Sequence, residues 1–215
     1  HKRMYRNKNI WKKNKIITPK EKRTIAYHEA GHASVSWLLE HANPLVKVTI
    51  VPRGQALGAA WYLPEERQIT TKAQLLDQMI SLLGGRAAEE IVFGEVSTGA
   101  LNDLERVTKQ AYAMVVYYGL DKEIGNISFY DSSGQSEYGF QKPFSDKTAE
   151  KIDAQIRSMV EEAYNKAKTI LVENREKLDA LATILVEREV IFREDVENIY
   201  GKRPWDEEKT DEQQA

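Results

Sequence analysis

The chain has 215 residues, enough for one large domain or two small ones with a buried core. Hydrophobic residues make up 41% and charged residues 30%, an ordinary composition for a folded globular protein. Cysteine is absent, which excludes disulfides, thiolate metal ligands and cysteine nucleophiles, so any metal must be held by His, Asp or Glu. No run of about 18 apolar residues and no secretory signal is present, and we expect no membrane span within this sequence.

Charge is distributed unevenly along the chain. Residues 1–23 carry a net charge of +9 and the rest −11, although the whole sequence has a net charge of only −2. A basic arm can bind phosphate or an anionic membrane surface, but a solvated segment is the commoner explanation. We interpret residues 1–17 as a basic linker or an expression remnant. The acidic body argues against nucleic acid as a partner.

Start and stop signals predict the elements of the first part of the chain. Thr18 and Glu21 flank a proline and are placed for a capping box, so we expect a helix over residues 19–40. Residues 45–52 and 57–63 are rich in β-branched or aromatic side chains. They predict two strands that form a hairpin or a small sheet.

Apolar residues recur at helical spacing through five further segments. These helices are expected over residues 70–93, 102–118, 146–172, 175–188 and 193–200. Gly84 and Gly85 interrupt the first of them, and close packing against a neighbour would compensate for their low helix propensity. Residues 120–145 are expected to form a long loop with a short strand near 127–130, and residues 201–215 a disordered acidic tail. The predicted fold class is therefore mainly α (α+β), a helical domain with a small hairpin or sheet.

One motif uses two of the four histidines in the chain, the sequence HEAGH at residues 28–32. Because residues four apart lie on one face of a helix, His28 and His32 can bind one metal ion. Glu29 can then take a proton from the attacking water and pass it to a leaving amine. A chance match is expected only about 0.01 times in such a chain. A helix with two structural histidines would leave this spacing unexplained, and the available ligand types favour zinc.

Two histidines do not complete a zinc site, so a third protein ligand is needed. The longer motif with a third histidine is excluded because position 38 is Leu38. His41 is about 13 Å further along the helix axis than His32 and points to another side, which makes it a poor ligand. The remaining candidates are carboxylates on later helices, namely Glu89, Glu90 and Asp103.

Three segments in a fixed order resemble the peptidase domain of the FtsH family, the membrane-anchored AAA+ zinc metalloproteases. They are HEAGH at 28–32, GGRAAEE at 84–90 and STGALNDL at 97–104. The resemblance covers about residues 16–200. It implies that Asp103 is the third zinc ligand and that Glu29 is the general base. It also places Glu89 beside the site, where it can accept the second N–H of a metal-binding imidazole. A solvated charge on the helix surface is the alternative for Glu89.

The segment before Pro64 resembles the edge strand that lies beside the active site in that family. Its residues are Gly58, Ala59, Ala60, Trp61 and Tyr62. An extended substrate can add to such an edge through main-chain hydrogen bonds. An ordinary hairpin of the core is the alternative.

The resemblance implies a zinc endopeptidase, with one Zn²⁺ per chain, that belongs to an ATP-dependent membrane-anchored protease. Its substrates would be unfolded, misfolded and membrane proteins. Within a peptidase domain at 18–200, residues 18–120 would hold the catalytic part and residues 145–200 the helices that form a hexameric ring.

The sequence contains no phosphate-binding loop, so ATP would act only through an AAA+ domain of the parent chain. We therefore expect a soluble fragment, excised from the C-terminal part of a parent protein whose peptidase domain lies on the cytoplasmic or organelle-matrix side. The alternatives are a catalytically silent module that forms or binds the ring, and a nucleic-acid binder that the acidic body disfavours.

Overall fold

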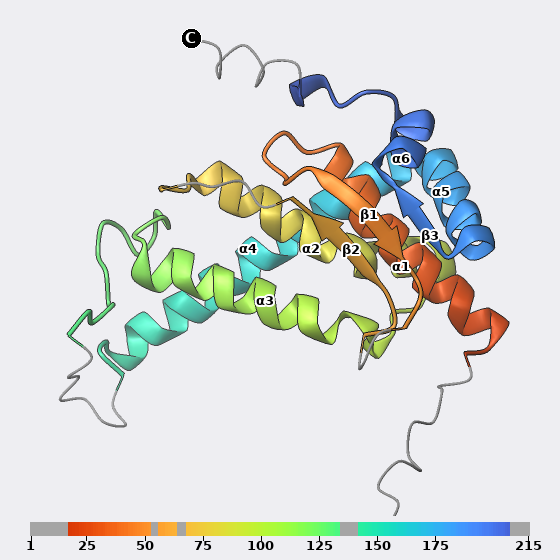
Figure 1. The fold of residues 1–215 in the computed structure, drawn as a ribbon. Helices are drawn as coiled ribbons and strands as arrows, with labels where there is room; N and C mark the ends of the chain where they lie inside the picture. Colours follow the sequence, from red (N-terminus) through yellow and green to blue (C-terminus); the bar gives the residue numbers. More distant parts are fainter. Residues whose placement is uncertain (1–16, 53–55, 64–67, 134–141, 207–215) are drawn as a thin grey trace, which may run out of the picture.

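The computed structural model describes residues 17–52, 56–63, 68–133, 142–206 and is mainly helical, with a small three-stranded antiparallel sheet (Figure 1). This confirms the predicted fold class. The helices are α1 Pro19–Trp37, α2 Lys72–Phe93, α3 Leu101–Tyr112, α4 Asp146–Glu173, α5 Arg175–Arg188 and α6 Arg193–Tyr200. The strands are β1 Leu45–Thr49, β2 Ala59–Tyr62 and β3 Val190–Phe192. One hydrophobic core contains residues of each helix from α1 to α6 and of strands β1 and β3.

Helix α1 begins as its sequence predicts and is buried along most of its length. The Thr18 hydroxyl accepts from the Glu21 N–H, and the Glu21 carboxylate accepts from the Thr18 N–H at 2.8 Å, which completes the capping box. The helix ends at Trp37, three residues earlier than expected. Beyond it the His41 N–H donates to Asp77 of α2, so a tertiary contact rather than a further helical turn satisfies that group.

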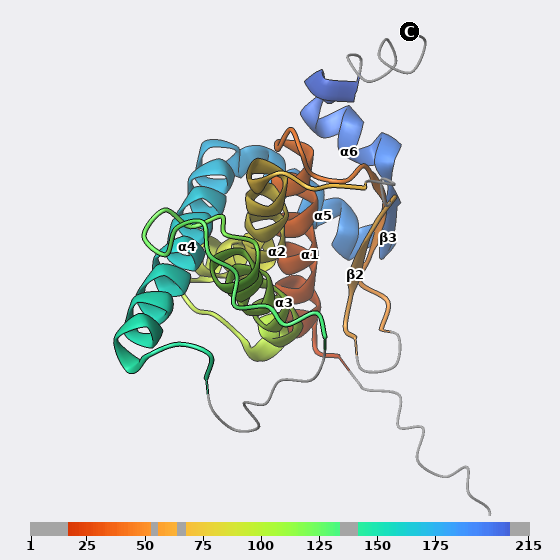
Figure 2. The same ribbon diagram turned by 90° about the vertical axis from the view of Figure 1, so that its left-hand side faces the viewer.

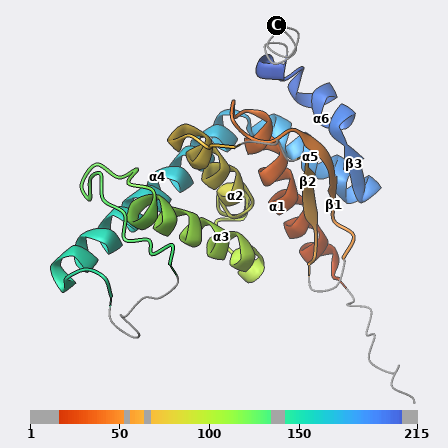
Figure 3. The same cartoon turned by 60° about the vertical axis from the view of Figure 1, so that its left-hand side comes forward.

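Helices α1 and α2 cross where both carry a glycine. A Cβ on Gly31 would lie 2.3 Å from the Gly84 carbonyl oxygen, and one on Gly84 would lie 2.7 Å from the Gly31 carbonyl oxygen. The expected close packing is therefore present, but α2 runs through Gly84-Gly85 without a break. In Figures 2 and 3 the two helices form the centre, with the sheet on one side and α3 and α4 on the other.

The sheet has the order β2-β1-β3 with both pairs antiparallel. The third strand was not predicted, because three residues between two helices carry too little periodicity to indicate a strand. Among the described strands β2 pairs only with β1, so its other edge offers unpaired backbone groups.

Two further expectations were wrong. Residues 127–130 form no strand. The predicted disordered tail does not begin at residue 201, because Arg203 is buried and donates to the carbonyl groups of Leu39 and Ala42 at 2.8 and 2.9 Å. These bonds fix the chain after α6 to the segment that follows α1. Residues 207–215 of the predicted tail and 1–16 of the basic segment lie outside the described residues.

Candidate metal centre

The buried middle of α1 presents two imidazole nitrogens to each other. The Nε2 atoms of His28 and His32 lie 3.1 Å apart. Their other ring nitrogens both contact residues of α2: Nδ1 of His28 lies 2.6 Å from Glu89, and Nδ1 of His32 lies 2.9 Å from the Ser81 carbonyl oxygen. Because both partners accept hydrogen bonds, they fix the N–H on Nδ1 and leave both Nε2 lone pairs free for a metal.

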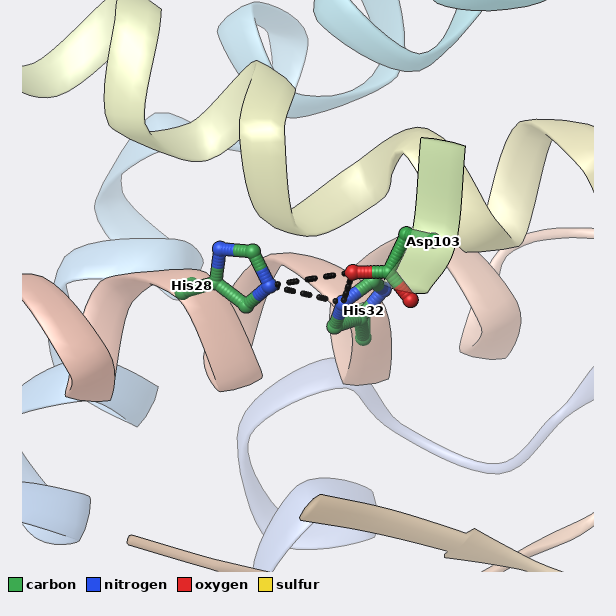
Figure 4. A group of neighbouring side chains, drawn as sticks. All are labelled: His28, His32 and Asp103. Atoms are coloured by element: carbon green, nitrogen blue, oxygen red, sulfur yellow. Dashed lines mark hydrogen bonds and ion pairs between the residues drawn. The ribbon is translucent and has the colours of Figure 1, made fainter. Parts of the chain in front are cut away.

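Asp103, near the start of α3, supplies an oxygen to the same point (Figure 4). Its Oδ2 lies 3.3 Å from Nε2 of His28 and 3.4 Å from Nε2 of His32. Ligands about 2.0–2.2 Å from a tetrahedral zinc ion are about 3.3 Å apart, so the three atoms fit one zinc ion. Within the described ranges this is the one cluster of at least three His, Asp or Glu side chains with such spacing.

The carboxylate of Glu89 links two parts of the site. One oxygen accepts from His28, and the other accepts from the Ser97 N–H at 2.7 Å. Burial raises the pKa of Glu89, but the bonds from His28 and Ser97 outweigh it and hold the pKa below its usual value. Glu89 thus remains an anion that orients His28 and ties it to the loop leading to Asp103.

The electrostatics of the cluster match a site built for a cation. Burial by itself lowers the pKa of His28, yet the hydrogen bonds to Asp103 and Glu89 raise it to about 10. Burial likewise raises the pKa of Asp103, and the two imidazoles reverse this and hold it well below its usual range. The carboxylates therefore favour positive charge between them, which a metal ion supplies at the same place.

Glu29 lies beside these groups but is not one of the three residues whose donor atoms converge. Only 7% of the residue is exposed, and burial raises the pKa of its carboxyl. A Cβ on Gly58 would lie 2.6 Å from Glu29 Oε1, so the glycine just before β2 leaves room for this carboxylate. A carboxyl whose pKa is raised is suited to take a proton and then release it.

Gly85 has a role that sequence reasoning missed. A Cβ there would lie 2.5 Å from Nε2 of His28 and 2.6 Å from Nε2 of His32. Helix α2 can thus pass close to the two Nε2 atoms because Gly85 has no side chain that would occupy their space. The pair Gly84-Gly85 was noticed as a break in helical propensity, but only the approach of α1 shows that the second glycine faces the site.

Two other side chains considered as ligands, His41 and Glu90, lie away from the cluster. His41 has Nε2 3.9 Å from Glu40 and is not part of the cluster. Glu90 points toward α4, where the Tyr164 hydroxyl donates to it and Lys168 Nζ lies 3.5 Å away. Successive residues of a helix are about 100° apart, so Glu89 and Glu90 cannot both face the site.

A cleft of about 1840 Å³ opens over the cluster. Its walls include Gly58, Ala59, Ala60 and Tyr62. The Tyr62 phenol lies 3.0 Å from the Ser36 hydroxyl, which donates to the His32 carbonyl oxygen at 2.6 Å. Of the five residues predicted for substrate contact, Trp61 alone lies outside the cleft lining.

The fold and the cluster define a class of protein, a helical domain with a histidine–carboxylate site for one metal ion next to a buried glutamate. Comparison with known families makes this specific. Residues 15–199 match peptidase family M41, and the chain belongs to that family.

Similar proteins are much longer than this chain. The ATP-dependent zinc metalloprotease FtsH of Parabacteroides distasonis is 63% identical over 194 residues, 90% of this chain and 28% of the relative. The mouse mitochondrial inner membrane m-AAA protease component AFG3L2 is 46% identical over 202 residues, 94% of this chain and 25% of the relative. The rice mitochondrial ATP-dependent zinc metalloprotease FTSH 8 is 49% identical over 197 residues, which are 90% of this chain and 24% of the relative. The chain thus spans roughly a quarter of these relatives. No helix among the described residues combines the length and apolarity that a membrane crossing needs.

Proposed function

We propose that this chain is a zinc-dependent endopeptidase in which His28, His32 and Asp103 hold one Zn²⁺. The observation that carries the proposal is the convergence of their three donor atoms, 3.1–3.4 Å apart, beside the buried Glu29. Membership of a peptidase family supports it.

Each residue of the site has a separate role in the proposed hydrolysis. Zinc, when bound, polarises the scissile carbonyl and lowers the pKa of water. Glu29 accepts the proton of the attacking water and returns it to the amine of the departing segment. Glu89 and the Ser81 carbonyl group hold the two imidazoles in the tautomer that presents Nε2.

The substrate is an extended polypeptide that pairs with the free edge of β2. The support is that β2 borders the cleft, and that a Cβ on Gly58, just before β2, would lie 2.6 Å from Glu29 Oε1. Main-chain pairing requires an unfolded segment but few particular side chains. Unfolded or misfolded proteins are therefore the proposed substrates.

The names of the relatives, together with the resemblance of the sequence to the FtsH family, support a proposal for the role of the whole protein. Those names describe ATP-dependent proteases, and one an inner-membrane complex. We infer that ATP acts through an AAA+ domain of the parent chain and that six copies form a ring. We also infer that the parent protein is anchored in a membrane and that membrane proteins are among its substrates. This domain would then lie on the cytoplasmic or organelle-matrix side. The competing proposal is a silent module that only assembles the ring, and the complete donor set with Glu29 disfavours it.

Metal content and casein hydrolysis, with and without a chelator, test the proposal. We expect about one zinc per chain and hydrolysis that the chelator abolishes. Glu29→Gln should retain zinc without activity, because an amide cannot take the proton, and Asp103→Ala should lose most zinc. Full zinc occupancy in Asp103→Ala would overturn the ligand assignment, and an inactive zinc-loaded wild type would favour the silent module.

A further inference from the structure

The outer face of the sheet carries a row of exposed side chains that leads to the free edge of β2. Lys47 of β1 pairs across the strands with Trp61 of β2 and with Phe192 of β3. Trp61 is 46% and Phe192 51% exposed, and Lys47 Nζ lies 5.1 Å from the centre of the Trp61 ring. Paired residues of an antiparallel sheet share a face, so the three side chains form one row.

A peptide that pairs with β2 extends this row by one residue. Its side chains alternate between the two faces of the sheet. One set enters the cleft, and the other stands on the outer face next to Trp61. This step rests on the proposed function, which places the substrate at that edge.

We propose that Trp61 selects a large apolar side chain on the outer face of the bound substrate, and that Lys47 disfavours lysine or arginine there. Aromatic residues gain most from aromatic or β-branched cross-strand neighbours. The ammonium of Lys47 already lies against the indole, so a second cation at the same ring meets like-charge repulsion.

The register limits where this preference falls in the substrate. A Cβ on Gly58 would lie 2.6 Å from Oε1 of Glu29, the proposed proton acceptor. Trp61 lies three residues further along the chain. At about 3.3 Å per residue the separation is about 10 Å. The selected side chain therefore lies about two or three residues from the scissile bond, beyond the reach of the catalytic groups.

The test measures binding and cleavage separately. Fluorescent peptides that differ only at one position, as Phe, Ala or Lys, are titrated by anisotropy against the zinc-loaded Glu29→Gln protein. The same peptides are digested by the protein with Glu29 intact, and the cut is located by mass spectrometry. We expect the Phe peptide to bind and to be cut best when that residue lies two or three positions from the cut.

Trp61→Ala should weaken binding of the Phe peptide by about two- to fivefold and leave the Ala peptide unchanged. Lys47→Ala should improve the Lys peptide relative to the other two. Phe192→Ala is the matched control, since it removes an equally exposed aromatic residue of the same row at the far edge of the sheet, and it should change nothing.

Equal affinities of the three peptides, or equal losses in Trp61→Ala and Phe192→Ala, would overturn this proposal. Trp61-dependent binding without cleavage by the wild type would support it while contradicting the proposed peptidase activity. If the Trp61→Ala protein cleaves the peptides with an unaltered preference for Phe, the peptidase activity would be supported and the role of Trp61 would be contradicted.

Discussion

At the scale of single residues, the space around the donor atoms matters as much as the donors. Nε2 of each histidine is aimed by a partner on its other ring nitrogen, Glu89 for His28 and the Ser81 carbonyl group for His32. Gly85 keeps the opposite side of both rings open. Gly85 is thus part of the site although it has no side chain that could bind a metal.

Replacing Gly85 with alanine should lower zinc affinity at least about tenfold, the lower end of the range for changes to the groups that surround metal ligands. The added Cβ would lie 2.5 Å from His28 Nε2, and the hydrogen bonds to the two rings resist their movement. Competition with a chromophoric chelator measures the affinity. Gly99→Ala, whose Cβ would lie 3.2 Å from the Ser97 hydroxyl, is the nearby control with near-normal affinity. An unchanged affinity in Gly85→Ala would contradict this reading of the site.

The pH dependence of the metal-free protein follows from the raised pKa of His28. That pKa is about 10, against a reference value of 6.5. The folded state therefore binds a proton more tightly than the unfolded state, and the resulting stability is complete below pH 6.5 and is lost as the pH rises toward 10. The melting temperature in chelator should fall over this range.

Two comparisons check the cause of that fall. With zinc present the trend should reverse below neutral pH, since protonation of the histidines expels the metal. Glu89→Gln should flatten the slope without the metal, because it removes one of the groups that raise the pKa of His28. A melting temperature that rises between pH 6.5 and 10 in chelator would contradict the assignment.

At the scale of elements, the crossing of α1 and α2 positions the site. The helices meet at Gly31 and Gly84, one residue from His32 and one from Gly85. No side chain separates the backbones there, so α2 comes close enough for Ser81 and Glu89 to reach the two imidazoles.

Gly31→Ala should therefore destabilise the domain by about 1–3 kcal/mol through overpacking. Helix propensity alone predicts a gain of about 1 kcal/mol, so the two effects differ in sign. Urea unfolding of the metal-free protein measures the difference. Gly85→Ala is the matched control, because its Cβ meets histidine rings and not backbone, and it should lose less stability while losing more zinc. A stabilised Gly31→Ala protein would show that the crossing is looser than described.

At the scale of the whole molecule, the segment after α6 is bonded to the last residue of α1 and to the segment that follows α1. Arg203 donates to the carbonyl groups of Leu39 and Ala42, and the Trp37 indole N–H donates to the Gly201 carbonyl oxygen. The end of α1 thus depends on residues more than 160 positions away.

Arg203→Met should lower the free energy of unfolding by about 2–3 kcal/mol, since it leaves buried carbonyl groups without their charged donor. Arg188→Ala breaks an ion pair to Asp195 whose arginine side chain is 59% exposed. Such a surface pair should cost less than about 1 kcal/mol. Equal losses in the two variants, measured by denaturant unfolding, would contradict the role given to Arg203.

The sequence by itself was enough to predict the features that depend on the spacing of nearby residues. The positions of His28, Glu29 and His32 follow from helical periodicity, and the capping box at Thr18 sets where α1 begins. The helical fold class followed from the same periodicity. The third ligand did not, because the residues alone left Glu89, Glu90 and Asp103 open.

Only the tertiary structure decided the rest. Asp103 approaches His28 across 75 positions of sequence, a separation that no helical spacing reports. Likewise β3 exists because β1 offers an edge to three residues that carry no pattern of their own, and Arg203 is buried because the carbonyl groups of Leu39 and Ala42, just after α1, need a donor. The sequence by itself determined the chemistry that α1 can perform. The packing of α2 and α3 against it decided which side chains complete the site, because contacts between distant segments depend on how whole elements fit together.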